Sequence, residues 1–207
     1  ELTGTVISKE IPGLKEINAV DAAGVHPLLL AIGSERYTPY MPAKQPSEIL
    51  TIANHILGTG QLSLAKFLFI TADDENKLTT SNVQGFMEYV LKRMDLTRDI
   101  HFYTNTSIDT LDYSGTGLNQ GSKVVFAAYG EIKRSLCKEI PDSLKELRDF
   151  INPKLVMPGI VCMNAKKFTD YNNAKKELEI LNEQLVPEIE NLNELPMIVV
   201  CDDSDFT

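Results

Sequence analysis

The sequence has no tryptophan and only three cysteines and three histidines. The cysteines form no Cys-x-x-Cys pair, and the histidines show neither His-x-His nor His-Glu-x-x-His spacing, so zinc-site patterns are missing. Few unpaired cysteines are typical of a reducing compartment, and we expect a cytoplasmic protein. His26, His55 and His101 are expected on helix faces or strand edges rather than around a metal.

Positive charge and long apolar runs are also scarce. The chain has 20 Lys and Arg residues and 29 Asp and Glu residues. The resulting net charge of −9 argues against a nucleic-acid partner. A membrane helix needs about 18 apolar residues, whereas the run at residues 155–163 is interrupted by Pro158. We therefore expect neither a nucleic-acid partner nor a membrane span.

The two ends of the sequence carry no start or stop signals of a domain. The chain opens at Glu1 without Met or a signal segment, and it closes soon after the apolar run 197–201. A strand at that place normally leads into a helix that covers the sheet. We expect the chain to be a fragment of a longer protein.

Buried apolar runs alternate with helical patterns along the chain. Residues 28–32 and 67–70 have the continuous apolar character of strands covered on both faces, and we expect them to be neighbouring central strands. Apolar residues at helical spacing over 49–57, followed by Gly58, predict a helix between them. This alternation predicts an α/β fold, layered α/β/α and Rossmann-like, with a mixed, mostly parallel sheet.

The remaining elements continue this alternation. A capping box of Ser81 and Gln84 is expected to start the clearest helix, which carries an apolar stripe over 83–94. The first 23 residues, with short β-prone pieces at 5–7 and 17–20, are expected to form an arm or edge strands. Further strands are expected at residues 100–103, 107–111, 124–127, 155–163 and 197–201, and further helices around 144–151 and 174–185.

Residues 28–75 are weakly echoed by residues 155–205, with Asp73 and Asp203 in register. An internal duplication would produce such an echo. The general likeness of βαβ units would produce it as well, and both explanations stay open.

Two acidic clusters, at residues 73–75 and 202–205, follow expected strands, where open α/β sheets place ligand groups. Converging carboxylates bind Mg²⁺, which would suit a stand-alone Mg²⁺- or phosphate-binding, receiver-like module. A place beside a helix N-terminus or in solvent is the plainer interpretation. Gly115, Gly117 and Gly121 match no phosphate-loop spacing and are expected to form a turn between strands.

Other charged residues have local structural explanations. Asp95, Arg98 and Asp99 follow the helix at 83–94, and an Arg fork between the two carboxylates would fix the helix-to-strand turn. Asp109 and Asp112 are expected to accept backbone N–H groups of their loop.

Four consecutive stretches resemble one known family. They are FLFITADDE (67–75), KRMDLTRDI (92–100), NTSIDTLDY (105–113) and GSK (121–123). Their order and spacing are similar to those of UbiD-type prenylated-FMN-dependent decarboxylases, the 3-octaprenyl-4-hydroxybenzoate carboxy-lyases and relatives, in the C-terminal region. The resemblance is strong over about residues 16–131 and loose over 132–207, and Leu96, Ser107 and Ala127 depart from the family pattern.

The resemblance implies a division of labour. The intact protein would be a carboxy-lyase that decarboxylates an aromatic or unsaturated carboxylic acid with prenylated FMN and a divalent cation. The family's flavin site and catalytic Glu-Arg-Glu set belong to an upstream domain, so no catalytic, cofactor-binding or metal-binding residue is assigned here. The chain alone is expected to be inactive, to mediate homo-oligomer assembly as a dimer or higher, and to close one side of the substrate pocket.

The same resemblance implies domain bounds and two site residues. Residues 1–23 would be an arm from the upstream flavin domain, 24–131 the C-terminal α/β decarboxylase domain, and 132–207 a truncated second lobe. By motif, Ile108 and Thr110 align with positions that line the substrate in the family. The alternating pattern around them also fits inward packing in a strand.

Overall fold

The structure is a computed structural model that describes residues 6–7, 9–20, 27–36, 40–41, 43–115, 117–186, 189 and 191–205. The chain divides into two compact units, Glu1–Lys133 and Arg134–Thr207. Within the described part, no helix is both long and apolar enough to span a membrane.

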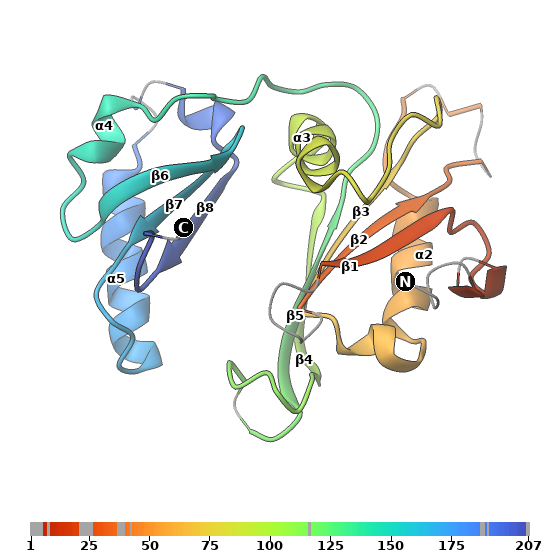
Figure 1. Cartoon of the computed structure of the whole chain (residues 1–207), viewed down its shortest axis with the longest axis horizontal. Coiled ribbons are helices and arrows are strands. Elements are labelled where there is room, and N and C mark those ends of the chain that lie inside the picture. The colour runs from red at the N-terminus through yellow and green to blue at the C-terminus, as the bar shows by residue number, and fades with distance from the viewer. Residues whose placement is uncertain are drawn as a thin grey trace. The chain divides into compact units, whose positions relative to one another are not determined.

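The first unit contains a five-stranded sheet in the order β1-β2-β3-β5-β4 (Figure 1). Parallel pairing joins β2 to β3 and β3 to β5, and antiparallel pairing adds β1 and β4 at the two edges. The sheet is mixed, as predicted, but parallel pairs do not outnumber antiparallel ones because both edge strands run the other way. The strands are β1 (Glu16–Val20), β2 (Leu28–Gly33), β3 (Phe67–Ala72), β4 (Ile100–Ser107) and β5 (Gln120–Ala127).

The prediction of two neighbouring central strands is confirmed. β2 and β3 pair in parallel from Leu28 with Phe67 to Gly33 with Ala72. Successive residues on a strand point to opposite faces, and both Leu29 and Leu30 are buried, so β2 is covered on both faces.

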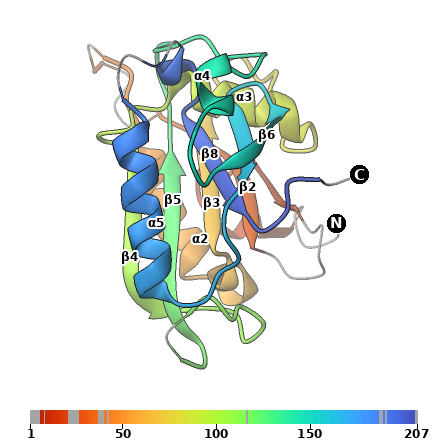
Figure 2. The ribbon, with the colours of Figure 1, turned by 90° about the vertical axis from the view of Figure 1, so that its left-hand side faces the viewer.

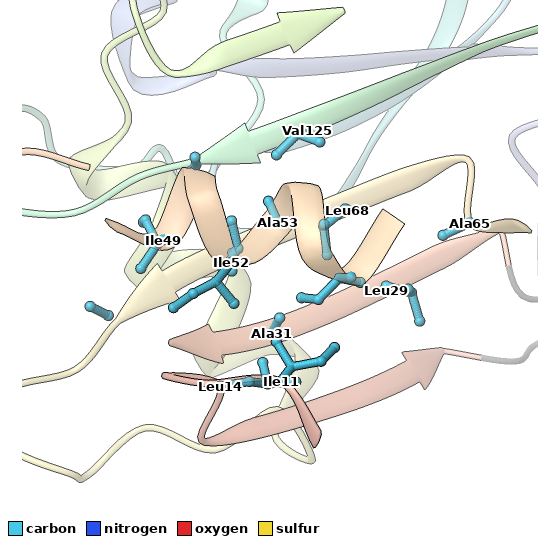
Figure 3. Close-up of a cluster of buried hydrophobic side chains, with 14 of the residues drawn as sticks. Ile11, Leu14, Leu29, Ala31, Ile49, Ile52, Ala53, Ala65, Leu68 and Val125 are labelled. Atoms are coloured by element: carbon cyan, nitrogen blue, oxygen red, sulfur yellow. The ribbon is translucent and has the colours of Figure 1, made fainter. Parts of the chain in front are cut away.

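Helix α2 (Glu48–Leu57) connects these strands, followed by the short 3₁₀ helix η1 (Gly60–Leu64). Its apolar stripe packs on one face of the sheet, where Figure 3 shows Ile49, Ile52 and Ala53 with side chains of β2, β3 and β5. Gly58 ends α2 as predicted, because its N–H donates to the carbonyls of Asn54 and His55.

The N-terminal residues belong to this unit. Residues 17–20 lie on the edge strand β1, as expected, and Ile11 and Leu14 are buried in the same core as α2. Val6 and Ile7 are helical, so the β-strand predicted at 5–7 is wrong for them, and Thr5 lies outside the described residues.

The capping box predicted for the next helix is wrong. Helix α3 (Val83–Arg93) begins after Asn82, whose side-chain oxygen accepts the N–H of Gly85 at 3.0 Å. The Asn82 side chain satisfies the N–H of Gly85, which has no acceptor within the helix. The helix therefore starts one residue later than it would with Ser81 as its N-cap.

The two strands expected at 100–103 and 107–111 are one strand. β4 runs from Ile100 to Ser107 with a register shift between Tyr103 and Thr106, so the polar residues 104–106 continue the strand instead of ending it. Residues 108–111 lie in a loop and turn instead of a strand. Gly115 and Gly117 lie in the β4–β5 connection, as expected. The prediction is wrong for Gly121, which lies on β5 because it pairs with Thr106 of β4.

The second unit contains a three-stranded sheet in the order β6-β7-β8. The single strand expected at 155–163 is two antiparallel strands, because the chain reverses at Gly159, whose φ is +81°. β7 and β8 are parallel and joined through α5, which covers one face of the sheet through Leu181 (Figure 2). The elements are α4 (Asp142–Lys145), shorter than predicted, β6 (Ile151–Met157), β7 (Ile160–Asn164), α5 (Tyr171–Gln184), η2 (Leu192–Glu194) and β8 (Met197–Cys201).

Candidate functional site

The predicted substrate-lining residues lie in the turn that follows β4. Ile108 is buried, 1% exposed, and a Cβ atom added to Gly121 would come within 2.7 Å of its Cδ1. Thr110 is exposed, and its Oγ1 accepts a hydrogen bond from Asn119 Nδ2 at 3.0 Å. Ile108 therefore packs inward under the loop, while Thr110 faces solvent.

Acidic side chains hold the shape of this loop, as predicted. Asp109 accepts the N–H of Leu111 at 2.8 Å, and Asp112 accepts the N–H of Ser114 at 2.9 Å. Lys66 pairs with Asp112 at 3.3 Å. Burial opposes ionisation of Asp112, but the Ser114 donors and the Lys66 charge outweigh it and lower its pKa.

Large apolar side chains stand out from the same loop. Leu111 is 56% exposed, Tyr113 87% and Leu118 77%. Together with Thr110 they make what we call the hairpin tip: Thr110, Leu111, Tyr113 and Leu118. A loop held by its own polar contacts thus presents apolar area to its surroundings.

The glycines of the loop leave no phosphate cradle. A Cβ atom added to Gly115 would lie 2.0 Å from the carbonyl oxygen of Gln120, so this glycine lets the loop close on itself. Among the described residues, no three His, Cys, Asp or Glu side chains lie close enough to share a metal ion.

Asp73, directly after β3, has a role that neither sequence interpretation foresaw. It is 4% exposed, and its carboxylate accepts the N–H groups of Glu75, Lys77 and Leu78 at 3.0, 2.5 and 2.6 Å. Burial opposes its ionisation, but these donors and the charge of Lys15 outweigh it and lower its pKa. Asp73 therefore folds the β3–α3 loop and neither caps a helix nor lies in solvent.

Asp74 joins a polar cluster that the sequence did not reveal. Its carboxylate accepts the hydroxyl of buried Tyr129 at 2.8 and 3.0 Å and pairs with Lys44. Burial and the neighbouring Asp74 raise the pKa of Tyr129 to about 12. Because lysine and tyrosine donors occupy this carboxylate, nothing in the cluster favours a Mg²⁺ module, and only spatial proximity could have indicated Lys44 and Tyr129.

The arginine fork differs in detail from its prediction. Arg98 donates from Nε and Nη2 to the fully buried carboxylate of Asp99, at 2.5 and 3.1 Å. Asp95 pairs instead with Lys133 at 3.2 Å, and Thr97 donors followed by Lys133 lower its pKa to about 2. The fork bridges one carboxylate, not two, because the lysine satisfies the other.

Among the residues that the structure describes, the second acidic cluster and the histidines form no metal-ligand group. Asp202 and Asp203 are exposed, and Asp205 pairs with Lys154. His55 is exposed on α2, His101 is half-buried on β4, and His26 lies outside the described residues.

Comparison with known proteins covers most of the first unit. Residues 1–128 match the family described as the 3-octaprenyl-4-hydroxybenzoate carboxy-lyase C-terminal domain. A Chlamydia pneumoniae protein, named as one of the subunits of 4-hydroxybenzoate decarboxylase, is 40% identical over 126 residues, which is 61% of this chain and 20% of that protein. An uncharacterized protein of Chlamydia caviae is 33% identical over 185 residues, which is 89% of this chain and 30% of that protein.

A solved structure is similar in fold. The vanillic acid decarboxylase of Sedimentibacter hydroxybenzoicus matches with a TM-score of 0.50 and 13% identity, covering 88% of this chain and 31% of that one. The chain spans about a fifth to a third of the length of these relatives. The family match extends over more than half of the sequence, and the chain therefore belongs to the UbiD family through its C-terminal domain.

Proposed function

We propose that this chain is the C-terminal assembly and pocket-closing portion of a UbiD-type decarboxylase acting on an aromatic or unsaturated carboxylic acid. Family membership supports the reaction class, carboxy-lyase. The names of two similar proteins, a 4-hydroxybenzoate and a vanillic acid decarboxylase, support an aromatic acid as substrate.

The hairpin tip is the observation that carries the pocket-closing role. Buried Ile108 and the Asp109 and Asp112 contacts preorganise the loop before any substrate arrives. The exposed Leu111 and Leu118 side chains offer apolar area suited to an aromatic ring, and Thr110 offers a hydroxyl beside them.

Prenylated FMN and its divalent cation belong, in this proposal, to a domain outside residues 1–207. Support comes from the family match, which is to the C-terminal domain of the carboxy-lyases. In this proposal residues 1–23 lead in from that domain and add the edge strand β1 to the sheet, residues 24–131 form the rest of the decarboxylase domain, and 132–207 form a second lobe. The chain alone neither holds flavin nor releases CO₂.

We also infer a layered, Rossmann-like α/β/α arrangement for the first unit. α2 packs on one face of β2 and β3, and α3 lies on the other side of β3 in Figure 1. Burial of both Leu29 and Leu30 supports coverage of both faces. The free thiols of the three cysteines support a cytoplasmic location.

Substrate preference tests the pocket-closing role. In the intact protein, Thr110→Val keeps the shape of the side chain and removes its hydroxyl. We expect the ratio of kcat/KM for 4-hydroxybenzoate over vanillate, followed by CO₂ release, to change about tenfold. Thr104→Val, at an exposed position on β4, is the matched control and should leave the ratio unchanged. Equal ratios in both variants and in the unsubstituted protein would show that Thr110 does not line the substrate pocket.

Self-association tests the assembly role. The apolar hairpin tip and the family region predict a dimer or higher homo-oligomer. Light scattering on the 207-residue chain at micromolar concentration should give a mass above one chain, whereas a strict monomer would contradict the proposal. A yellow preparation with bound flavin would contradict the division of labour instead.

A further inference from the structure

Two cysteines of the second unit face each other across neighbouring parallel strands. Cys162 on β7 pairs with Val199, and Cys201 on β8 pairs with Asn164, so both side chains lie on one face of the sheet. Their sulfur atoms are 3.0 Å apart. A disulfide bond needs a separation of about 2.05 Å, so the two sulfurs need to approach by only about 1 Å.

The two thiols have different surroundings. Cys162 is 2% exposed, whereas Cys201 is half-exposed and contacts the carbonyl oxygen of Asp203 at 3.2 Å in the turn after β8. Burial and the neighbouring Cys201 thiol raise the pKa of Cys162 to about 11. An oxidant from solvent therefore meets Cys201 first, and the buried Cys162 thiol is the less accessible of the two.

We propose that Cys162 and Cys201 are a redox modification site that forms a reversible disulfide across β7 and β8, with a peroxide as oxidant. The Cys201 thiolate attacks one peroxide oxygen, the O–O bond breaks, and hydroxide leaves and takes a proton, giving Cys201 sulfenic acid and water from hydrogen peroxide. The Cys162 sulfur then attacks the sulfenic sulfur, and the second oxygen leaves as water with the Cys162 proton. Two thiols are oxidised to one disulfide, and one peroxide is reduced to two waters.

The bond has a structural consequence inside the second unit. It links positions 39 residues apart, and the loop that it closes contains α5. Closing this loop restricts the unfolded chain, so the oxidised protein should unfold at a higher temperature than the reduced protein. A thiol reductant should reverse the change, as for the transient redox-sensing disulfides of reducing compartments.

The test uses the intact protein, reduced, freed of reductant and treated with hydrogen peroxide until half of an added N-acetylcysteine standard is oxidised. Free thiols are then alkylated and peptides mapped without reduction. We expect a cross-linked peptide pair containing Cys162 and Cys201, a loss of two hydrogen masses, and full reversal by dithiothreitol. Cys137→Ser, which removes the buried third thiol, is the matched control and should form the same bridge.

Single variants separate the two roles. Cys162→Ser should stop at Cys201 sulfenic acid, trapped by dimedone, and Cys201→Ser should leave Cys162 reduced under the same treatment. Alkylation of both thiols in the peroxide-treated protein would overturn the proposal. A bridge that uses Cys137, or oxidation of Cys201 to sulfinic acid without a bridge, would overturn it as well.

Discussion

The two units of this chain share one order of strands and helices, but they bury these elements to different extents. In the first, β1 pairs antiparallel with β2, and β2, α2 and β3 form a parallel crossover. In the second, β6 pairs antiparallel with β7, and β7, α5 and β8 repeat that crossover. Leu28 pairs with Phe67 in the first unit, and Ile160 pairs with Met197 in the second. Phe67 on β3 and Met197 on β8 therefore hold equivalent positions.

Burial separates the two units. α2 buries Ile49, Ile52, Ala53 and Ile56, whereas within α5, described throughout, only Leu181 is buried. On β8, Val199 and Val200 are 41% and 36% exposed, whereas β3 is buried from its second residue onward because β5 pairs beside it. The crossover alone thus gives the topology, and the added strands decide how much of it becomes core.

The loops after the second strands also differ. In the first unit the buried Asp73 carboxylate collects three backbone N–H groups. In the second, Asp203 is exposed and accepts the N–H of Asp205 at 2.8 Å, and buried Ser204 ties the turn to Asn152 and Asn164. A buried carboxylate with three backbone N–H donors thus holds the loop in the first unit, whereas an exposed carboxylate with one such donor and a buried serine hold it in the second.

The largest expected effect concerns the aligned strand positions Leu68 and Ile198. Leu68 is 1% exposed and Ile198 is half-buried. Leu68→Ala should lower the free energy of unfolding by about 2–5 kcal/mol, because it removes buried methyl groups and leaves a cavity. Ile198→Ala should cost clearly less. Urea denaturation of both variants measures the difference, and equal losses would break the contrast in burial.

The next effect concerns Arg98, whose guanidinium group pairs with the fully buried carboxylate of Asp99. Arg98→Ala should lower the free energy of unfolding by about 1–3 kcal/mol, because Asp99 loses its charged partner. Arg148→Ala, at an exposed position in the second unit, is the control and should stay within about 0.5 kcal/mol. An unchanged denaturation midpoint in Arg98→Ala would show that solvent replaces the guanidinium.

The sequence carried most of the element order because apolar periodicity reports burial directly. β2, β3, α2 and α5 follow their patterns. The wrong predictions are those in which a single residue sets where an element begins or ends. Gly159 divides one apolar run into the two strands of a hairpin, and Asn82 sets the start of α3. Pairing partners that lie far away in sequence leave no periodic signal, so β4 was divided at its polar residues.

The site was less predictable than the fold. Family resemblance suggests Ile108 and Thr110 as substrate-lining residues, which stays a prediction. A strand pattern cannot show that Thr110 is exposed and that Ile108 is buried in the loop after β4. The Asp74 cluster needs Lys44 and Tyr129, which lie 30 and 55 residues from Asp74 and meet it only in the folded chain. The Cys162 and Cys201 pair is missed for the same reason, since 39 residues separate the two thiols.

A smaller, pH-dependent effect distinguishes Asp73 from Asp203. The pKa of Asp73 is lowered in the folded state, so its contribution to stability is present above its unfolded pKa of about 3.9 and is lost as pH falls through the folded value. Asp73→Asn should cost about 1–2 kcal/mol near pH 7 and much less near pH 3, measured by urea denaturation at both pH values. Asp203→Asn should be nearly neutral at both, and a pH-independent Asp73 effect would contradict this assignment.

The smallest effect concerns the helix starts. The Asn82 side chain accepts one backbone N–H of α3, and Asp170 accepts those of Asn172 and Asn173 at 2.9 and 3.0 Å on α5. Each change to Ala should cost about 1 kcal/mol, and Asp170→Ala should cost more because its charge also favours the helix N-terminus and α5 has little buried area to compensate. Ser81→Ala is the control and should be neutral. If calorimetry gave Ser81→Ala the same loss of stability as Asn82→Ala, Ser81 would be a cap of α3 after all. The comparison between the two helix starts would then fail.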